Sequence, residues 1–199
     1  MMRFYKILAL ALFILPLQGF GPGLIQTVPD FSLRDVSGKY ISPKDYPKAK
    51  GFMVVFICNH CPFAKLYIKR LNDLNTKYSA LNVPLLAIDP MDSLTYEDET
   101  FAHMQQRAKA EGFNFPYLSD GTETAARSFN ARRTPDAFVI WKENNQWIIK
   151  YQGAIDDNGS EPDSVHHTYL STAVYELLAG TPVKEPSTIS IGCYVHYRG

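Results

Sequence analysis

"GFMVVFICNHCPF", residues 51–63, is the stretch that decides the fold. Its first seven residues form a continuous apolar run with β-branched side chains, which is typical of a strand buried on both faces of a sheet. Cys58 and Cys61 follow at once, two residues apart, and Pro62 suits the first turn of a helix. The stretch therefore predicts a buried central strand, a C-x-x-C pair and a helix start, in that order.

Strands and helices alternate along the rest of the chain. Hydrophobic spacing and turn residues predict an N-terminal β-hairpin within residues 28–46, strands over 83–90, 137–142 and 147–153, and helices over 63–80, 95–112, 123–131 and 163–180. Alternation of this kind gives a parallel core, and the late hairpin adds antiparallel strands. The predicted fold is α/β: a central mixed sheet flanked by helices, with an N-terminal hairpin extension.

Composition limits the partners. The 199 residues suit one domain with a well-filled core. Twenty basic and twenty acidic residues cancel, so there is no excess of positive charge to bind nucleic acid.

The amino terminus predicts export. Arg3 and Lys6 precede an apolar run from Ile7 to Leu17, which is too short for a comfortable membrane span and is typical of a signal peptide. We expect a signal peptide over residues 1–22, one domain over 23–182 and a tail over 183–199 that packs on it. The protein would be periplasmic or otherwise extracytoplasmic, without a stable span after cleavage; an uncleaved anchor is the alternative.

The position of the C-x-x-C pair favours redox chemistry. Unpaired N–H groups at a helix start stabilise a thiolate, so Cys58 is predicted to be the exposed nucleophile and Cys61 the resolving thiol. His60, between them, favours the thiolate when it is protonated. A zinc site would need two further ligands, from Cys193, His103, His166, His167 or His196. A purely structural disulfide is the other alternative, although so small a loop restrains the unfolded chain least.

Cys193 leaves two possibilities open. It is either an inert cysteine of the tail or a third redox sulfur near Cys58.

Several segments together resemble a known family. The hairpin "VPDFSLRDVSGKYISPKDY", the stretch "MVVFICNHCPF", the loop "RRTPDAFVIW" and the segment "YQGAIDDN" are similar to the thioredoxin-fold redoxin family, in its alkyl hydroperoxide reductase/thiol-specific antioxidant-like and TlpA-like branch. The "CNHCP" form and the tail "ISIGCYVHYR" resemble its peroxiredoxin-like thioredoxin subgroup. The resemblance covers about residues 27–198.

The resemblance implies thiol–disulfide exchange. Cys58 would attack a partner disulfide and Cys61 would resolve the mixed disulfide. Pro135, preceded by Thr134, would be a cis-proline whose backbone pairs with the substrate chain. The implied partners are protein thiols or disulfides and an upstream redox protein, and no cofactor is implied.

Two departures from the family pattern bear on activity. Peroxiredoxins carry P-x-x-x-T-x-x-C, but the corresponding positions hold Gly51 and Val55 before Cys58, and Val54 and Cys58 before Cys61. Arg133 stands where many relatives of the subgroup have a cysteine; its guanidinium either favours a Cys58 thiolate or points into solvent beside Arg132.

The function predicted from the sequence is therefore an exported thiol–disulfide oxidoreductase. A redoxin-type thiol peroxidase, or a non-catalytic metal- or protein-binding module on the same fold, remains as the alternative. The sequence leaves the direction of electron flow and the oligomeric state open.

Overall fold

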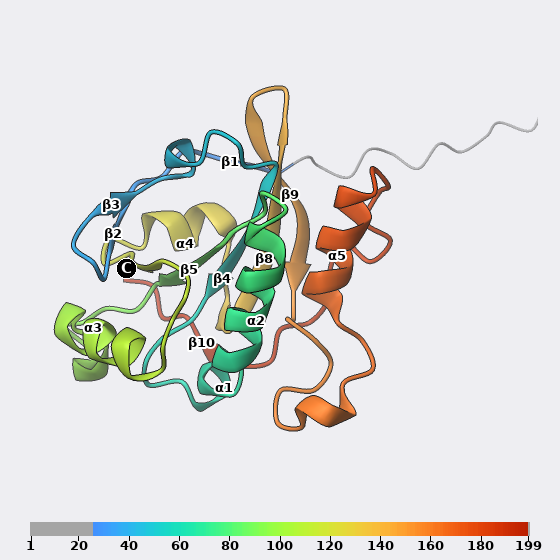
Figure 1. Ribbon diagram of the computed structural model, residues 1–199. Coiled ribbons are helices and arrows are strands. Elements are labelled where there is room, and N and C mark those ends of the chain that lie inside the picture. The colour runs from blue at the N-terminus through green and yellow to red at the C-terminus, as the bar shows by residue number, and fades with distance from the viewer. Residues whose placement is uncertain (1–25, 199) are drawn as a thin grey trace, which may run out of the picture.

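An eight-stranded mixed sheet forms the centre of the computed structural model, which describes residues 26–198 (Figure 1). In sheet order the strands are β1 (Thr27–Val28), β9 (Gln146–Gly153), β8 (Asp136–Glu143), β4 (Gly51–Phe56), β5 (Leu85–Asp89), β6 (Tyr117–Ser119), β2 (Leu33–Asp35) and β3 (Tyr40–Ile41). β2 and β3 are the two strands of the predicted N-terminal hairpin.

The predicted central strand is confirmed as β4. All six of its residues are buried, and it pairs in parallel with β5 and antiparallel with β8. Its side chains alternate between two apolar clusters, with Met53 and Val55 in one and Phe52 and Val54 in the other. Burial on both faces explains why this strand has no polar alternation.

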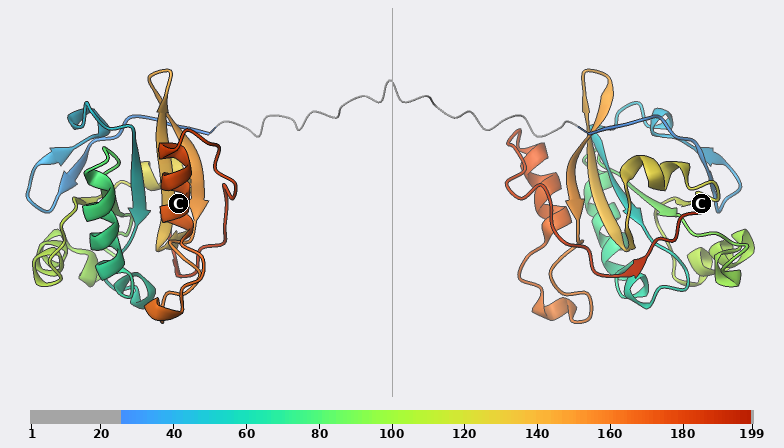
Figure 2. Two further views of the ribbon diagram at one scale, coloured as in Figure 1. Left: turned by 45° about the vertical axis from the view of Figure 1, so that its right-hand side comes forward. Right: turned by 180° about the vertical axis from the view of Figure 1, so that it is seen from behind.

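Helices cover both faces of the sheet. Residues of α2 (Ile68–Ser79), α3 (Phe101–Ala110) and α5 (Tyr169–Leu178) belong to the cluster that contains Met53, while α4 (Thr124–Phe129) packs on the opposite face with Phe52. Figure 2 shows α4 from behind, on the side of the sheet away from α2. The expected sheet with helices on both faces is confirmed.

All four predicted helices are shorter in the structure than the sequence predicts, and the helix expected over 123–131 spans only Thr124–Phe129. The helix expected over 63–80 is divided into α1 (Pro62–Lys65) and α2, because the N–H groups of Leu66 and Tyr67 bond three residues back and tighten the turn. The helix expected over 95–112 divides at Thr100, whose hydroxyl caps α3, and a short 3₁₀ turn, η2 (Glu97–Glu99), precedes it.

The last helix begins at Tyr169 rather than near residue 163. The backbone groups of His166 and His167 are instead hydrogen-bonded to Asp157. A 3₁₀ turn, η3 (Pro162–Ser164), precedes this segment. The three-residue strand β6 was not predicted from the sequence.

The tail after Pro182 crosses the back of the molecule. It first bonds to β9, where Gln152 exchanges hydrogen bonds with Pro186 and Thr188. It then forms β10 (Cys193–Tyr194), which pairs antiparallel with β7 (Arg133–Thr134) in a separate two-stranded sheet. Figure 2 shows the tail in red, in front of the sheet when seen from behind.

Within residues 26–198, no helix combines the length and the apolar character that a membrane span requires. The predicted signal peptide lies outside the described residues.

Candidate active site

The two cysteines lie where β4 leads into α1. Cys61 is the N-cap residue of α1, and Cys58 lies before the helix, in the loop that follows Phe56. Both residues are 0% exposed. The expectation that Cys58 is exposed and part of a helical turn is therefore wrong, because the loop folds inward beneath the surface; its role as nucleophile stays a prediction.

Thr134 contacts both sulfurs. Its hydroxyl oxygen lies 3.1 Å from Cys58 Sγ, and its carbonyl oxygen accepts a 2.9 Å hydrogen bond from Cys61 Sγ. The following Thr134–Pro135 peptide bond is cis, as the resemblance implies. The structure thus brings together Cys58, Cys61, Thr134 and Pro135, all named from the sequence.

His60 lies beside Cys58 and is held by a buried carboxylate. Its Nε2 is 4.0 Å from Cys58 Sγ, and its Nδ1 is 2.5 Å from Glu99 Oε1. Glu99 also accepts 2.8 Å hydrogen bonds from the backbone N–H groups of Asn59 and His60. Tyr96 stacks on the imidazole with ring centroids 4.5 Å apart, so the ring orientation is fixed on two sides.

A second buried carboxyl group lies beneath this contact. Asp89, at the end of β5, is hydrogen-bonded to Glu99, and the Tyr117 hydroxyl lies 3.2 Å away. Burial raises the pKa of Asp89 well above its ordinary value, and the Glu99 charge adds to this effect. Burial also acts to raise the pKa of Glu99, but hydrogen bonds from Asp89 and from the Asn59 and His60 backbone lower it overall. Asp89 therefore keeps the proton and Glu99 carries the charge.

The two thiols share a proton unequally. A hydrogen bond from Cys58 lowers the pKa of Cys61 to about 4, helped by contacts with Cys193 and with the Ala64 backbone N–H. The same interaction and burial raise the pKa of Cys58. Of the two thiols Cys61 is thus the more acidic, in place of the expected Cys58, because Cys61, as N-cap, lies nearer the N–H groups of α1; when Cys61 loses its proton, its hydrogen bond to the Thr134 carbonyl is lost.

Arg133 is not directed at the sulfurs. Its guanidinium donates 2.9 Å hydrogen bonds to the Gly192 carbonyl and the Tyr194 hydroxyl, and it stacks over the Tyr194 ring. The expected effect of Arg133 on a Cys58 thiolate is thus replaced by a contact with the tail. Arg107 is the guanidinium that reaches the loop, where it donates to the Cys58 carbonyl oxygen over 2.6 Å.

Comparison with known proteins agrees with this geometry. The family model described as "AhpC/TSA family" matches residues 24–157. The chain belongs to the AhpC/TSA family. Its match includes the C-x-x-C pair, His60, Asp89 and Glu99, and also Thr134 and Pro135.

Relatives of the AhpC/TSA chain include redox proteins. The thiol-disulfide oxidoreductase ResA of Bacillus anthracis is 27% identical over 115 residues, which are 58% of this chain and 62% of ResA. The alignment thus spans less than two thirds of that curated relative. An uncharacterized conserved protein from Geobacillus kaustophilus has a similar structure, with a TM-score of 0.78 and 30% identity over 88% of this chain and 93% of that one.

A more distant structure shows the fold alone. A putative thiol:disulfide interchange protein DsbE from Chlorobium tepidum has a TM-score of 0.54 and 17% identity, covering 78% of this chain and 95% of that one. The thioredoxin-like fold expected from the sequence is confirmed.

One group of side chains in this AhpC/TSA chain could hold a metal ion. Ligand atoms of Cys58, His60 and Glu99 all lie within 4.8 Å of one another. Thiolate, imidazole and carboxylate are the donors that zinc accepts, and three of them would leave a fourth position open. This set was not predicted from the sequence, because no motif indicates that Glu99 lies near Cys58 and His60 in the fold.

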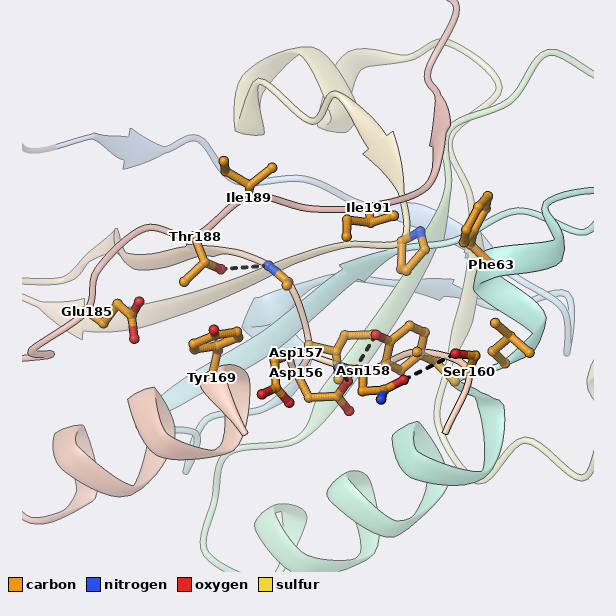
Figure 3. Close-up of a pocket in the computed structure, with 16 residues that line it drawn as sticks. Phe63, Asp156, Asp157, Asn158, Ser160, Tyr169, Glu185, Thr188, Ile189 and Ile191 are labelled. Carbon is orange, nitrogen blue, oxygen red and sulfur yellow. Dashed lines mark hydrogen bonds between the residues drawn. The ribbon is translucent and has the colours of Figure 1, made fainter. Parts of the chain in front are cut away.

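A cleft of about 630 Å³ is lined by Pro135, the residue after Thr134, and by residues of the tail. Phe63 of α1 lies at one end of the cleft and Tyr169 and Glu185 at the other (Figure 3). Its apolar walls include Ile189 and Ile191 of the tail, both largely exposed. The cleft therefore joins the cis-proline loop to an apolar surface that carries exposed carboxylates.

Proposed function

We propose that this AhpC/TSA chain is an exported thiol–disulfide oxidoreductase in which Cys58 and Cys61 form a reversible disulfide. One observation carries the proposal: both sulfurs contact Thr134, directly before the cis-proline Pro135. A dithiol held against one residue is poised for exchange, and the low pKa of Cys61 supplies a thiolate at neutral pH. No cofactor is needed, because sulfur carries the electrons. Protein thiols and disulfides are the substrates that the relatives' names suggest.

His60 and Glu99 support the exchange as positioning residues. An imidazole 4.0 Å from Cys58, anchored by a buried carboxylate, can move a proton to or from the Cys58 sulfur as the disulfide opens and closes. Thr134 and Pro135 would hold the partner chain next to the pair. Which cysteine meets the partner is a separate question, because both are buried.

Reduction of insulin by dithiothreitol tests the activity. The wild-type protein should accelerate it, and variants Cys58→Ser and Cys61→Ser should not. Mild oxidation of the wild type should also remove two hydrogens from the peptide that contains both cysteines, as mass spectrometry can measure. No acceleration and no mass change would overturn the proposal.

The Cys58, His60 and Glu99 set favours metal binding as the second candidate function. Purified protein that holds stoichiometric metal, and loses it in Glu99→Gln, would support this alternative.

Peroxide consumption tests the thiol peroxidase alternative. It is disfavoured because Val55, a buried β4 residue, stands where the family's catalytic threonine would precede Cys58.

Export is part of the proposal and rests on Arg3, Lys6 and the apolar residues that follow. A fusion of residues 1–30 to a reporter that is active only outside the cytoplasm should be active. A reporter retained in the cytoplasm would overturn the export proposal and leave the redox proposal unaffected.

A further inference from the structure

Cys193 lies beside the buried pair. β10 pairs with β7 so that Cys193 is opposite Thr134, the residue that contacts both other sulfurs. The Cys193 thiol and backbone N–H lie near enough to Cys61 to help lower its pKa. Cys193 is half-buried, whereas Cys58 and Cys61 are fully buried. The three cysteines of the chain thus form one cluster, with Cys193 at its outer end.

The tail is fitted closely to this position. A Cβ atom added to Gly192 would lie 2.1 Å from the Thr134 carbonyl oxygen, so glycine permits the close approach. Arg133 holds the Gly192 carbonyl, and the Val195 N–H donates to the Arg132 carbonyl over 3.0 Å. Cys193 is therefore fixed by backbone contacts on both sides.

We infer that Cys193 is a third redox cysteine, which exchanges a disulfide with the buried pair through Cys61 and carries it to partner thiols. This inference rests on the proposed function. A buried disulfide can then reach a protein partner, because Cys193 is the one of the three cysteines that extends toward solvent.

The internal step is a disulfide exchange. From the Cys58–Cys61 disulfide, the deprotonated Cys193 sulfur attacks Cys61 Sγ. The Cys61–Cys193 bond forms as the Cys58–Cys61 bond breaks, and the released Cys58 thiolate takes up the proton that Cys193 lost. The oxidation level of the protein does not change, so no further reactant is required.

The external step consumes a partner dithiol. A partner thiolate attacks Cys193 Sγ, and Cys61 leaves as a thiolate; its low pKa makes it a good leaving group. The partner's second thiol then attacks the partner sulfur of the mixed disulfide and releases Cys193. The partner gains a disulfide, and this protein is reduced by the same two electrons. In reverse, the same steps reduce a partner disulfide.

Disulfide mapping in Cys58→Ser tests the internal step. After equilibration in glutathione buffers and tryptic digestion, residues 51–65 should be linked to residues 185–198 through Cys61 and Cys193. Cys61→Ser is the matched control, and it should give much less of the corresponding linkage through Cys58. Free thiols in Cys58→Ser, in buffers that oxidise the wild-type pair, would overturn the inference, as would equal linkage in both variants.

The external step is tested with Cys193→Ser, which keeps the Cys58–Cys61 pair. It should still lose two hydrogens on oxidation, but should exchange with a peptide dithiol several-fold more slowly than the wild type. Equal rates would overturn the role of Cys193 and leave the proposed function standing. Absence of any reversible disulfide in the wild type is the distinct outcome that overturns the proposed function.

Discussion

Asp89 shows how much a single buried residue contributes at this site. It ends β5 and is 2% exposed, beside the charged Glu99 and the Tyr117 hydroxyl. Two ionised carboxylates in this volume would repel each other strongly, so one of them retains a proton. That proton lets Asp89 donate a hydrogen bond to Glu99, which in turn orients His60.

The raised pKa of Asp89 makes stability depend on pH. Above the ordinary aspartate pKa of about 3.9 the unfolded chain has lost this proton while the folded protein keeps it. Stability from this group is therefore full below that pH and falls as pH rises toward the folded-state pKa. Asp89→Asn removes this loss, so its free energy of unfolding should improve relative to wild type between pH 5 and pH 7.

Urea unfolding at pH 5, 6 and 7 measures the effect. The exposed Asp163→Asn serves as the control and should parallel the wild type at every pH. If the difference between Asp89→Asn and wild type were the same at all three values, the raised pKa would be contradicted.

The tail strand β10 is the element that completes the site. Two residues make only a short ladder with β7, so side-chain contacts must hold it in place. Arg133 supplies two hydrogen bonds and a stacking contact to this strand, and Gly192 permits its approach to Thr134.

Arg133→Ala should loosen β10. Loss of one stacked, hydrogen-bonded guanidinium is expected to cost about 1 kcal/mol, locally rather than throughout the fold. Hydrogen–deuterium exchange of residues 192–196 should become faster, while Arg132→Ala, at the exposed neighbouring residue, should leave it unchanged. Unaltered exchange in Arg133→Ala would show that the tail does not depend on this contact.

Gly192→Ala should separate Cys193 from Cys61. The added methyl group would lie 2.1 Å from the Thr134 carbonyl oxygen, which forces backbone movement at a cost of about 1–3 kcal/mol. The matched control is Gly121→Ala, since an added Cβ there meets nothing within 4 Å. Iodoacetamide should alkylate Cys193 faster in reduced Gly192→Ala than in wild type or the control; equal rates would contradict the close fit.

On the scale of the whole molecule, charge is balanced overall but not at the cleft. The chain has equal numbers of acidic and basic residues. The cleft beside Pro135 nevertheless carries the exposed carboxylates of Asp157 and Glu185 next to apolar walls (Figure 3). Burial acts to raise the pKa of Asp157, but hydrogen bonds from the His167 and His166 backbone lower it overall, so Asp157 is charged at neutral pH.

This cleft should favour basic partners. A disulfide peptide with lysines near its cysteines should exchange a few-fold faster than its glutamate counterpart, and salt should reduce the difference. The double variant Asp157→Asn, Glu185→Gln should lose the preference while it retains the basal rate with glutathione disulfide. A preference that survives in the double variant would place the selectivity elsewhere.

Local patterns predicted several parts of the protein correctly. The apolar run before Cys58 favoured a doubly buried strand, as the structure shows, and Pro62 marked the following helix start. Thr134 and Pro135 were found by resemblance, and the structure places them against both sulfurs. The strand and the helix start depend on residues that are adjacent in the chain, so periodicity and motif were sufficient for them, whereas Thr134 and Pro135 required the resemblance.

The exposure and charge of the site depended on contacts between distant segments. In the sequence Asp89 resembles an ordinary turn residue before Pro90. Parallel pairing of β5 with β4, however, brings the carboxyl ends of both strands to one edge of the sheet, where functional residues of such sheets gather, and this could have identified Asp89. Glu99 lies 39 residues from His60 and carried no motif.

The sequence by itself determined the sheet's central strand and the C-x-x-C pair, because each is encoded in a short, contiguous pattern, whereas the cis-proline at Pro135 was expected only from the family resemblance. Only the tertiary structure decided that Cys58 is buried, that Cys61 is the more acidic of the two thiols, and that Arg133 binds the tail rather than the sulfurs. The physical reason is that burial and pKa depend on every group packed around an atom. At this site those groups come from the β4–α1 loop, the end of β5, η2, the β7 loop and the tail.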